Sequence, residues 1–249
     1  MDAEVPRVAT GIPGFDKLIE GGFPKNFVIL LAGTPGTGKS IFSLEYIYNG
    51  AASLNENGVY ITLEQKVENL KKQALQFGWD FDELEKKEKV VIEKMDEFDV
   101  GITIKKIKKS IEKINAKRLV VDSLSGILAQ VSMHRELFSQ VRGMYPATGT
   151  GLQMTHDKES MRKVIWDIFM RLSDLNCTTL IPSEIPVGTE QLSSDGVSEF
   201  ACDGVILLKK LAMGREGIRT VSVEKMRSTR IDEAKHDLQF TEKGIIVGE

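Results

Sequence analysis

The sequence has few of the features that mark secreted, membrane or nucleic-acid-coating proteins. Its only two cysteines, Cys177 and Cys202, lie in or beside apolar runs without metal-ligand spacing, which favours a reduced interior over a disulfide framework. No apolar run approaches the roughly 20 residues of a membrane helix, and no apolar segment follows the acidic N-terminus as in a signal peptide. A formal net charge of −3 argues against a surface that binds nucleic acid everywhere, although it allows a local basic groove. We therefore expect a soluble, cytoplasmic protein that does not bind membranes.

The chain of 249 residues has the composition of a globular protein, with 41% hydrophobic and 28% charged residues. Near-continuous apolar runs alternate with segments of helical spacing, which is typical of a parallel sheet covered by helices on both faces. The last apolar runs have no helices between them and predict antiparallel strands joined by hairpins. The fold class is thus α/β, in a single domain over 1–249, with a long loop or insertion at 132–160. The expected strands are 27–31, 58–63, 90–92, 119–122, 178–181, 204–208, 219–224 and 244–247, and the main helices lie within 41–48, 67–75, 102–114 and 164–172.

One motif carries a specific chemistry. Gly33-Thr34-Pro35-Gly36-Thr37-Gly38-Lys39-Ser40 fits the phosphate-loop pattern Gly-x4-Gly-Lys-[Ser/Thr], between a predicted strand and a helix that continues at Ile41. Glycines allow backbone N–H groups to turn inward around a phosphate, and the helix N-terminus adds its positive dipole end. Lys39 would neutralise the β- and γ-phosphates and the Ser40 hydroxyl would hold Mg2+. The sequence therefore predicts binding of ATP or ADP with Mg2+ by residues 33–41.

Polar residues follow three of the predicted strands. Asp122 ends an apolar strand where a carboxylate suits the Mg2+ coordination sphere through a bound water; the alternative is a cap of the following helix. Glu64 ends the second strand and is the candidate that orients and polarises the attacking water; the alternative is a solvated strand end. Ser183 either senses the γ-phosphate or has only a structural role.

The opening Thr10-Gly11-Ile12-Pro13-Gly14-Phe15-Asp16, with Gly21-Gly22 before the phosphate loop, resembles the KaiC-like, RadA-paralogue branch of the RecA superfamily of ATPases. The segments that follow occur in that family's order, and the resemblance covers essentially the whole chain. It implies a RecA-type core that assembles head to tail into a ring, commonly a hexamer, with nucleotide between neighbouring subunits. The matching segments are 61–64, 119–124, 199–208 and 224–229, followed by Phe240 and Gly244-Ile245.

The resemblance also assigns a role to two cations near the C-terminus. In the family, a Lys-x-Arg pair reaches the γ-phosphate of the adjacent protomer, and the pattern falls on Lys225 and Arg227. Such a pair would act as an arginine finger supplied in trans, adding positive charge where negative charge develops. Taken without the family, the same residues are equally well a solvated strand end.

The sequence departs from the clock members of this family. Those members have two tandem domains, whereas this chain has room for one. Their adjacent Ser-Thr autophosphorylation sites correspond here to Glu199 and Phe200, which cannot accept phosphate, and their paired glutamates correspond to Glu64 and Gln65. We therefore do not expect a timekeeping autokinase, and the catalytic role rests on Glu64 alone.

The leading hypothesis is an ATPase whose hydrolysis is coupled to a regulatory or DNA-repair partner. One alternative is a recombination accessory protein that binds single-stranded DNA, because the loops near 124–160 and 184–200 face the central channel in RecA-type proteins. Another is a nucleotide-gated interaction module in which turnover is incidental. The second loop has almost no basic residues, but the first region offers an electrostatic groove and one aromatic platform, Tyr145. Its basic residues are His134, Arg135, Arg142, Lys158, Arg162 and Lys163.

Overall fold

A mostly parallel sheet organises the fold and confirms the predicted α/β class. The computed structural model describes residues 5–96, 100–129, 153–213 and 216–248; within them the nine-stranded sheet has the order β11-β10-β9-β8-β3-β7-β6-β4-β5. Strands β3 to β8 are parallel to their neighbours, and β8 to β11 follow one another antiparallel. The strands are β3 (Val28–Gly33), β4 (Gly58–Thr62), β5 (Val90–Lys94), β6 (Arg118–Asp122), β7 (Thr178–Glu184), β8 (Gly204–Met213), β9 (Glu216–Met226), β10 (His236–Thr241) and β11 (Gly244–Val247).

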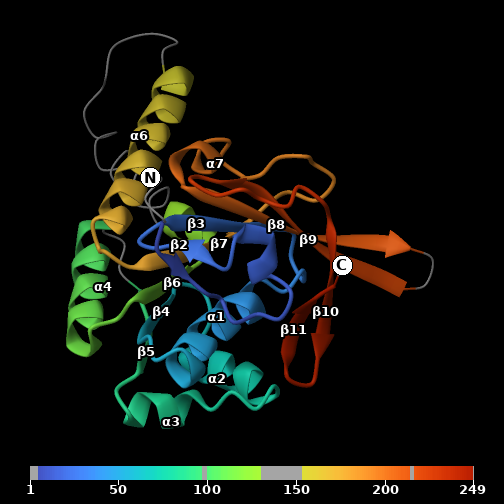
Figure 1. The fold of residues 1–249 in the computed structure, drawn as a ribbon. Coiled ribbons are helices and arrows are strands. Elements are labelled where there is room, and N and C mark those ends of the chain that lie inside the picture. The colour runs from blue at the N-terminus through green and yellow to red at the C-terminus, as the bar shows by residue number, and fades with distance from the viewer. Residues whose placement is uncertain (1–4, 97–99, 130–152, 214–215, 249) are drawn as a thin grey trace.

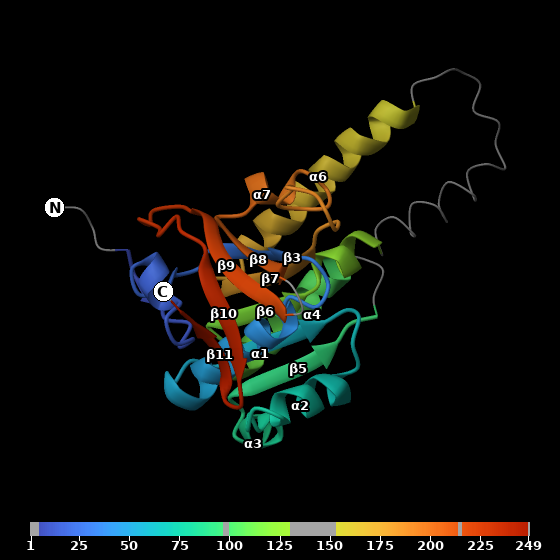
Figure 2. The same ribbon diagram turned by 90° about the vertical axis from the view of Figure 1, so that its right-hand side faces the viewer.

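Helices cover both faces of this sheet (Figure 1). Helices α1, α2 and α3 pack against one face, and α4 and α6 pack against the other. Figure 2 shows β9, β10 and β11 side by side at one end of the sheet, while α6 projects beyond its margin. The helices are α1 (Lys39–Ser53), α2 (Val67–Leu75), α3 (Phe81–Lys86), α4 (Val100–Ile114), α6 (Gln153–Ser173) and α7 (Ser198–Ala201), with a 3-10 turn η1 (Asp16–Ile19) near the N-terminus.

The central strand β3 shows why its sequence is apolar throughout. Ile29 and Leu31 belong to the core beneath α1, whereas Val28 and Leu30 belong to the core beneath α4 and α6. All four side chains are fully or almost fully buried. Because successive side chains of a strand point to opposite faces, a strand buried on both faces needs apolar residues at every position.

The structure corrects one predicted segment and adds two elements that the sequence did not predict. The loop or insertion expected at 132–160 is too long, because α6 begins at Gln153 and includes 153–160; positions 132–152 lie outside the described residues. Helix α3 was not predicted, since it is short and buries only Phe81 and Leu84; the Asp80 side chain caps it by accepting a hydrogen bond from Glu83 N at 2.9 Å. Strand β10 was not predicted either, because Leu238 is its only fully buried side chain.

The Thr-Gly-Ile-Pro-Gly-Phe-Asp opening folds into a compact turn closed by Asp16. One carboxylate oxygen accepts hydrogen bonds from Thr10 N at 2.9 Å and from the Thr10 hydroxyl at 2.7 Å, and the other accepts from Gly11 N at 3.1 Å. This turn follows β1 (Arg7–Val8), which pairs with β2 (Phe23–Pro24) in a separate two-stranded sheet. The acidic residue of the motif thus has a structural reason to stand there, since it satisfies two backbone donors.

Among the described residues, every helix is too short or too polar to cross a bilayer.

Candidate active site at the carboxyl edge of the sheet

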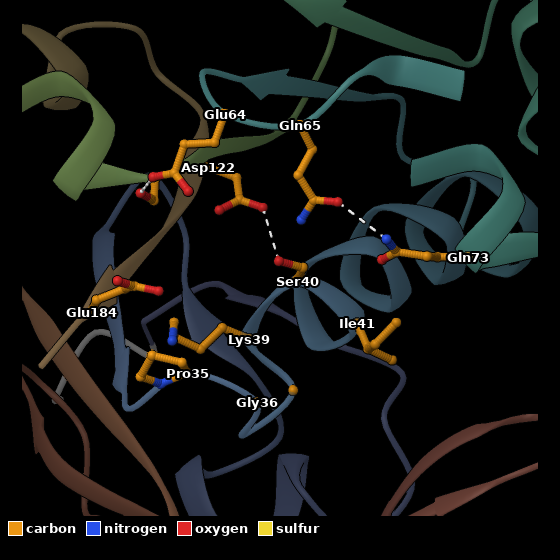
Figure 3. Close-up of a pocket in the computed structure, with 12 residues that line it drawn as sticks. Pro35, Gly36, Lys39, Ser40, Ile41, Glu64, Gln65, Gln73, Asp122 and Glu184 are labelled. Carbon is orange, nitrogen blue, oxygen red and sulfur yellow. Dashed lines mark hydrogen bonds between the residues drawn. The ribbon is translucent and has the colours of Figure 1, made fainter. Parts of the chain in front are cut away.

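The sheet topology brings the predicted site residues to one edge. Strands β3, β4, β6 and β7 are parallel, so their carboxyl ends meet, with Gly33 beside Glu184 and Thr62 beside Asp122 in the pairing register. A cavity of about 290 Å³ opens at this edge, which is where ligands bind in open α/β sheets. Figure 3 shows side chains from β6, the end of β7, α1, α2 and the loop after β4 turned toward it. It is lined by Pro35, Gly36, Gly38, Lys39, Ser40, Ile41, Glu64, Gln65, Gln73, Asp122, Ser123 and Glu184.

The loop between β3 and α1 has the backbone that a phosphate loop needs. Gly36 and Gly38 have φ values of 78° and 107°, which residues with a side chain rarely adopt. A Cβ at Gly38 would lie 2.4 Å from Cζ of Phe240, so a side chain there would have to displace the ring of this β10 residue. The backbone angle therefore favours glycine at position 38, and the packing of β10 against the loop adds to this preference.

Lys39 is the first residue of α1, and its side chain turns back toward the loop that precedes the helix. Its ammonium Nζ donates to the backbone oxygens of Gly33 at 2.8 Å and Thr34 at 3.1 Å. Burial lowers the pKa of Lys39 from its ordinary value, and the negative charges of the nearby carboxylates oppose this shift. These carboxylates are Glu184, Asp122 and Glu64.

Ser40 and Asp122 are in direct contact, as a shared metal site requires. Ser40 Oγ donates to Asp122 Oδ2 at 3.1 Å, and the Tyr60 hydroxyl donates to the same oxygen at 2.5 Å. Burial raises the pKa of Asp122, whereas the two hydroxyl donors and Lys39 oppose the shift. A bound cation would further favour the ionised carboxylate.

This oxygen pair fits Mg2+, which prefers hard oxygen ligands and usually takes one or two from protein and the rest from phosphate and water. Within the described residues, no group of three or more His, Cys, Asp or Glu is arranged to hold a metal alone. The donor set is therefore one that would hold Mg2+ together with a nucleotide. Tyr60 was missed by the sequence analysis, because a tyrosine within an apolar strand is indistinguishable from a core residue.

Glu64 lies just after β4 and lines the cavity. Its Oε1 accepts a hydrogen bond from the Ser123 hydroxyl, which fixes the carboxylate next to Asp122. Glu184 was not predicted as a site residue, yet its place beside Gly33 at the end of β7 directs it toward Lys39. Ser183 does not line the cavity: it is fully buried in β7, and no described group hydrogen-bonds its hydroxyl.

Lys225 and Arg227 lie at the opposite edge of the sheet. In the antiparallel pairing of β8 with β9, Lys225 is opposite Val205 near the start of β8, whereas the phosphate loop follows the far end of β3. Lys225 Nζ donates to the backbone oxygens of Glu199 at 2.9 Å and Cys202 at 2.7 Å. Arg227 forms an ion pair with Asp203 at 2.9 Å. Within one chain, neither cation belongs to the cavity.

The residues proposed for a DNA-binding groove are only partly described. Positions 130–152, with His134, Arg135, Arg142 and Tyr145, lie outside the described residues, as does the side chain of Lys158. Arg162 and Lys163 lie on α6, which packs on the face of the sheet away from α1.

A strand, a glycine loop and a helix that presents Lys39 and Ser40 next to an Asp122 carboxylate define a P-loop nucleoside triphosphatase with a RecA-type core. A family model described as "ATPase: KaiC" matches residues 8–149 and 147–249. The chain belongs to this KaiC-like family of RecA-superfamily ATPases.

Individual relatives agree with this assignment. A UPF0273 protein of Methanocaldococcus jannaschii is 32% identical over 241 residues, covering 97% of this chain and 96% of the relative. A UPF0273 protein of Thermotoga maritima is 34% identical over 246 residues, covering 98% and 96%. The crystal structure of a KaiC-like protein from Pyrococcus horikoshii superposes with a TM-score of 0.82 at 35% identity, covering 98% of this chain and all of that one.

The circadian clock oscillator protein KaiC of Thermosynechococcus vestitus is 30% identical over 237 residues. The match covers 91% of this chain but only 41% of that relative. This chain therefore spans less than half of the length of the clock protein.

Proposed function

We propose that this protein binds ATP with Mg2+ at the carboxyl edge of the sheet and hydrolyses it to ADP and phosphate. The observation that carries the proposal is the convergence of Lys39, Ser40 and Asp122 in one cavity, with Ser40 and Asp122 in hydrogen-bond contact. Lysine, hydroxyl and carboxylate are the three groups that phosphate-loop enzymes use to hold the phosphates and their metal.

In this proposal each residue has a defined task. The loop amides and Lys39 hold the β- and γ-phosphates, and Ser40 and Asp122 hold Mg2+, which neutralises charge on the phosphate oxygens. Water adds to the γ-phosphorus while the bond to the bridging oxygen breaks. Glu64, fixed by Ser123, orients this water and accepts the proton that it loses.

We also propose that the protein acts as a ring, commonly a hexamer in the family it resembles, with Lys225 and Arg227 serving the nucleotide of the neighbouring copy. Their position at the far edge of the sheet from the chain's own phosphate loop supports this arrangement, because a head-to-tail neighbour would bring the two edges together. Regulation or DNA repair is the proposed role of the turnover, with a protein or single-stranded DNA as its partner.

The test is phosphate release with Mg-ATP from the wild-type protein, from Lys39→Ala and from Lys72→Ala. Lys39→Ala should abolish release, because the leaving charge loses its positive partner, whereas Lys72, which is exposed on α2, should tolerate the change. Unchanged release from Lys39→Ala would refute the proposal. Adding single-stranded DNA and measuring mass by light scattering in the same buffer tests the partner and the ring: stimulation by DNA supports the repair role, and a monomer with ATP contradicts the ring.

A further inference from the structure

Gln65 lines the cavity, but the proposed hydrolysis gives it no role. It follows Glu64 in the turn between β4 and α2, and both Gln65 and Gln73 line the cavity. Gln73 Nε2 donates to Gln65 Oε1 at 3.1 Å. Figure 3 shows the consequence: the oxygen of the Gln65 amide faces Gln73, and its nitrogen is turned toward Ser40.

The backbone at Gln65 is fixed as well as its side chain. Gln65 N donates to the Thr62 hydroxyl oxygen at 3.0 Å, and that hydroxyl donates to Gln65 O at 3.0 Å. Thr62 is buried in β4. Thr62 therefore fixes the backbone of Gln65, and Gln73 of α2 fixes its side-chain amide. A group held in place in this way binds a ligand more tightly than a mobile one.

The Gln65 nitrogen differs from the other side-chain donors that line the cavity. Each of the others already donates to a protein oxygen, whereas no described group accepts a hydrogen bond from Gln65 Nε2. A donor at the margin of such a cavity is available to a ligand. The engaged donors are those of Lys39, Ser40, Gln73 and Ser123.

The charges of the cavity explain why an amide suits this position. Three carboxylates line the cavity against one lysine ammonium. A fourth carboxylate at position 65 would add repulsion toward an anionic ligand, while a neutral N–H donor attracts a phosphate oxygen without that cost. The phosphate loop would bind the phosphates nearest the helix N-terminus. The Gln65 nitrogen lies on the side of Ser40 away from this loop, toward β4 (Figure 3).

We infer that Gln65 determines the preference for a triphosphate over a diphosphate: its amide nitrogen donates to an oxygen of the terminal phosphate, and Gln73 positions it. The inference rests on the proposed function, since it names the ligand group read by the same site. It also gives α2 a direct connection to the terminal phosphate, through the hydrogen bond between the two glutamines.

The experiment compares affinities for ADP and for a non-hydrolysable ATP analogue, both with Mg2+, by calorimetry. Gln65→Met keeps the length of the side chain and removes the donor; it should weaken binding of the ATP analogue about tenfold to a hundredfold. Binding of ADP should stay within about twofold. Gln65→Glu, which has the same shape and adds a negative charge, should weaken the analogue further.

Two more variants separate recognition from structure. Gln73→Met should lower the preference for the ATP analogue in part, because the Gln65 amide loses its positioning partner. Gln76→Met, at the exposed C-cap of α2, should leave both affinities unchanged. The melting temperature of each variant is measured as a check on its stability. If Gln65→Met destabilises the fold, the isosteric Gln65→Glu is used for the comparison instead.

The outcomes are distinguishable. Loss of preference in the Gln65 variants with ADP affinity retained supports the inference. Equal weakening of both nucleotides, or no change in their ratio, overturns it while leaving the ATP site in place. Failure of the wild-type protein to bind either nucleotide removes the proposed function itself.

Discussion

The two edges of the parallel sheet are built differently. At the carboxyl edge, Lys39, Ser40, Asp122 and Glu64 converge on one cavity from three separate strand ends. At the opposite edge, Lys225 donates to backbone oxygens and Arg227 pairs with Asp203, and the Arg227 side chain remains half exposed there. Under the proposed function, the carboxyl edge binds the nucleotide within a single chain, whereas Lys225 and Arg227 at the other edge act on the nucleotide of a second copy.

The largest effect that would test this comparison is expected for Arg227→Ala. A cation supplied in trans acts on the charge that develops during phosphoryl transfer, so turnover should fall about a thousandfold or more, with nucleotide affinity nearly unchanged. The ion pair with Asp203 is half exposed, so its loss should cost at most about 1 kcal/mol of stability. Steady-state phosphate release and nucleotide titration measure the two effects.

Arg230→Ala is the matched control, since Arg230 is exposed nearby and has no proposed task. A large loss of nucleotide affinity in Arg227→Ala would contradict a role confined to the transition state. Equal effects of both arginine variants would point to general surface charge instead of a specific contact.

The next effect is expected for Glu64→Gln at the carboxyl edge. Removing a group that accepts the proton of water should slow phosphate release about a hundredfold to ten-thousandfold. ATP binding and assembly should persist, because Lys39, Ser40 and Asp122 remain. Glu68→Gln, exposed on α2, is the control, and normal turnover by Glu64→Gln would remove the assignment.

Mixing the Glu64→Gln and Arg227→Ala proteins tests whether the carboxyl edge of one copy meets the Arg227 edge of its neighbour. In assemblies shown by light scattering to contain both, some interfaces combine an intact carboxyl edge with an intact arginine edge, and part of the activity should return. An absence of rescue in such mixed assemblies argues against sites shared between copies.

The smallest expected effect concerns the support of the phosphate-loop helix by the C-terminal strands. Glu45, buried in α1, accepts a hydrogen bond from Ile245 N of β11 at 2.8 Å. Burial raises the pKa of Glu45 to about 7 from its ordinary value of 4.5, although the Ile245 N–H opposes the shift. The folded protein therefore binds more protons than the unfolded chain between these values, and stability is lost as the pH rises from about 4.5 through 7.

Glu45→Gln keeps an oxygen for Ile245 N and removes the ionisation. At pH 8 this variant should be more stable than the wild-type protein by about 1 to 3 kcal/mol, and at pH 4 the two should be nearly equal. Urea unfolding at both pH values measures the difference. A difference of the same size at both would contradict ionisation as the cause.

The fold was predictable to the extent that its signals are local. Phe27 to Leu31 and similar apolar runs specify strands buried on both faces, and the late runs without helices between them specify antiparallel pairing. Helix α3 and strand β10 escaped because each buries too few side chains to give a periodic signal. Helix α6 starts earlier than expected because the polar residues from Gln153 onward lack an apolar stripe.

The candidate site was predictable in part for the same reason. Residues 33–41 are contiguous, and Asp122 and Glu64 each follow an apolar strand, so the sequence alone placed them at one sheet edge. The structure brings them together, while their roles stay predictions. Tyr60, Glu184 and Gln73 gave no such signal, because their proximity depends on which strands are neighbours.

The sequence by itself determined the phosphate loop, the alternation of strands and helices, and the membership of the family, because each is written in residues that are close along the chain. The tertiary structure alone decided that Gln65 and Gln73 meet in the cavity, that Glu184 lies opposite Lys39, and that Lys225 and Arg227 lie at the other edge. Strand order and register follow from burying whole apolar surfaces at once, and no short segment contains that information.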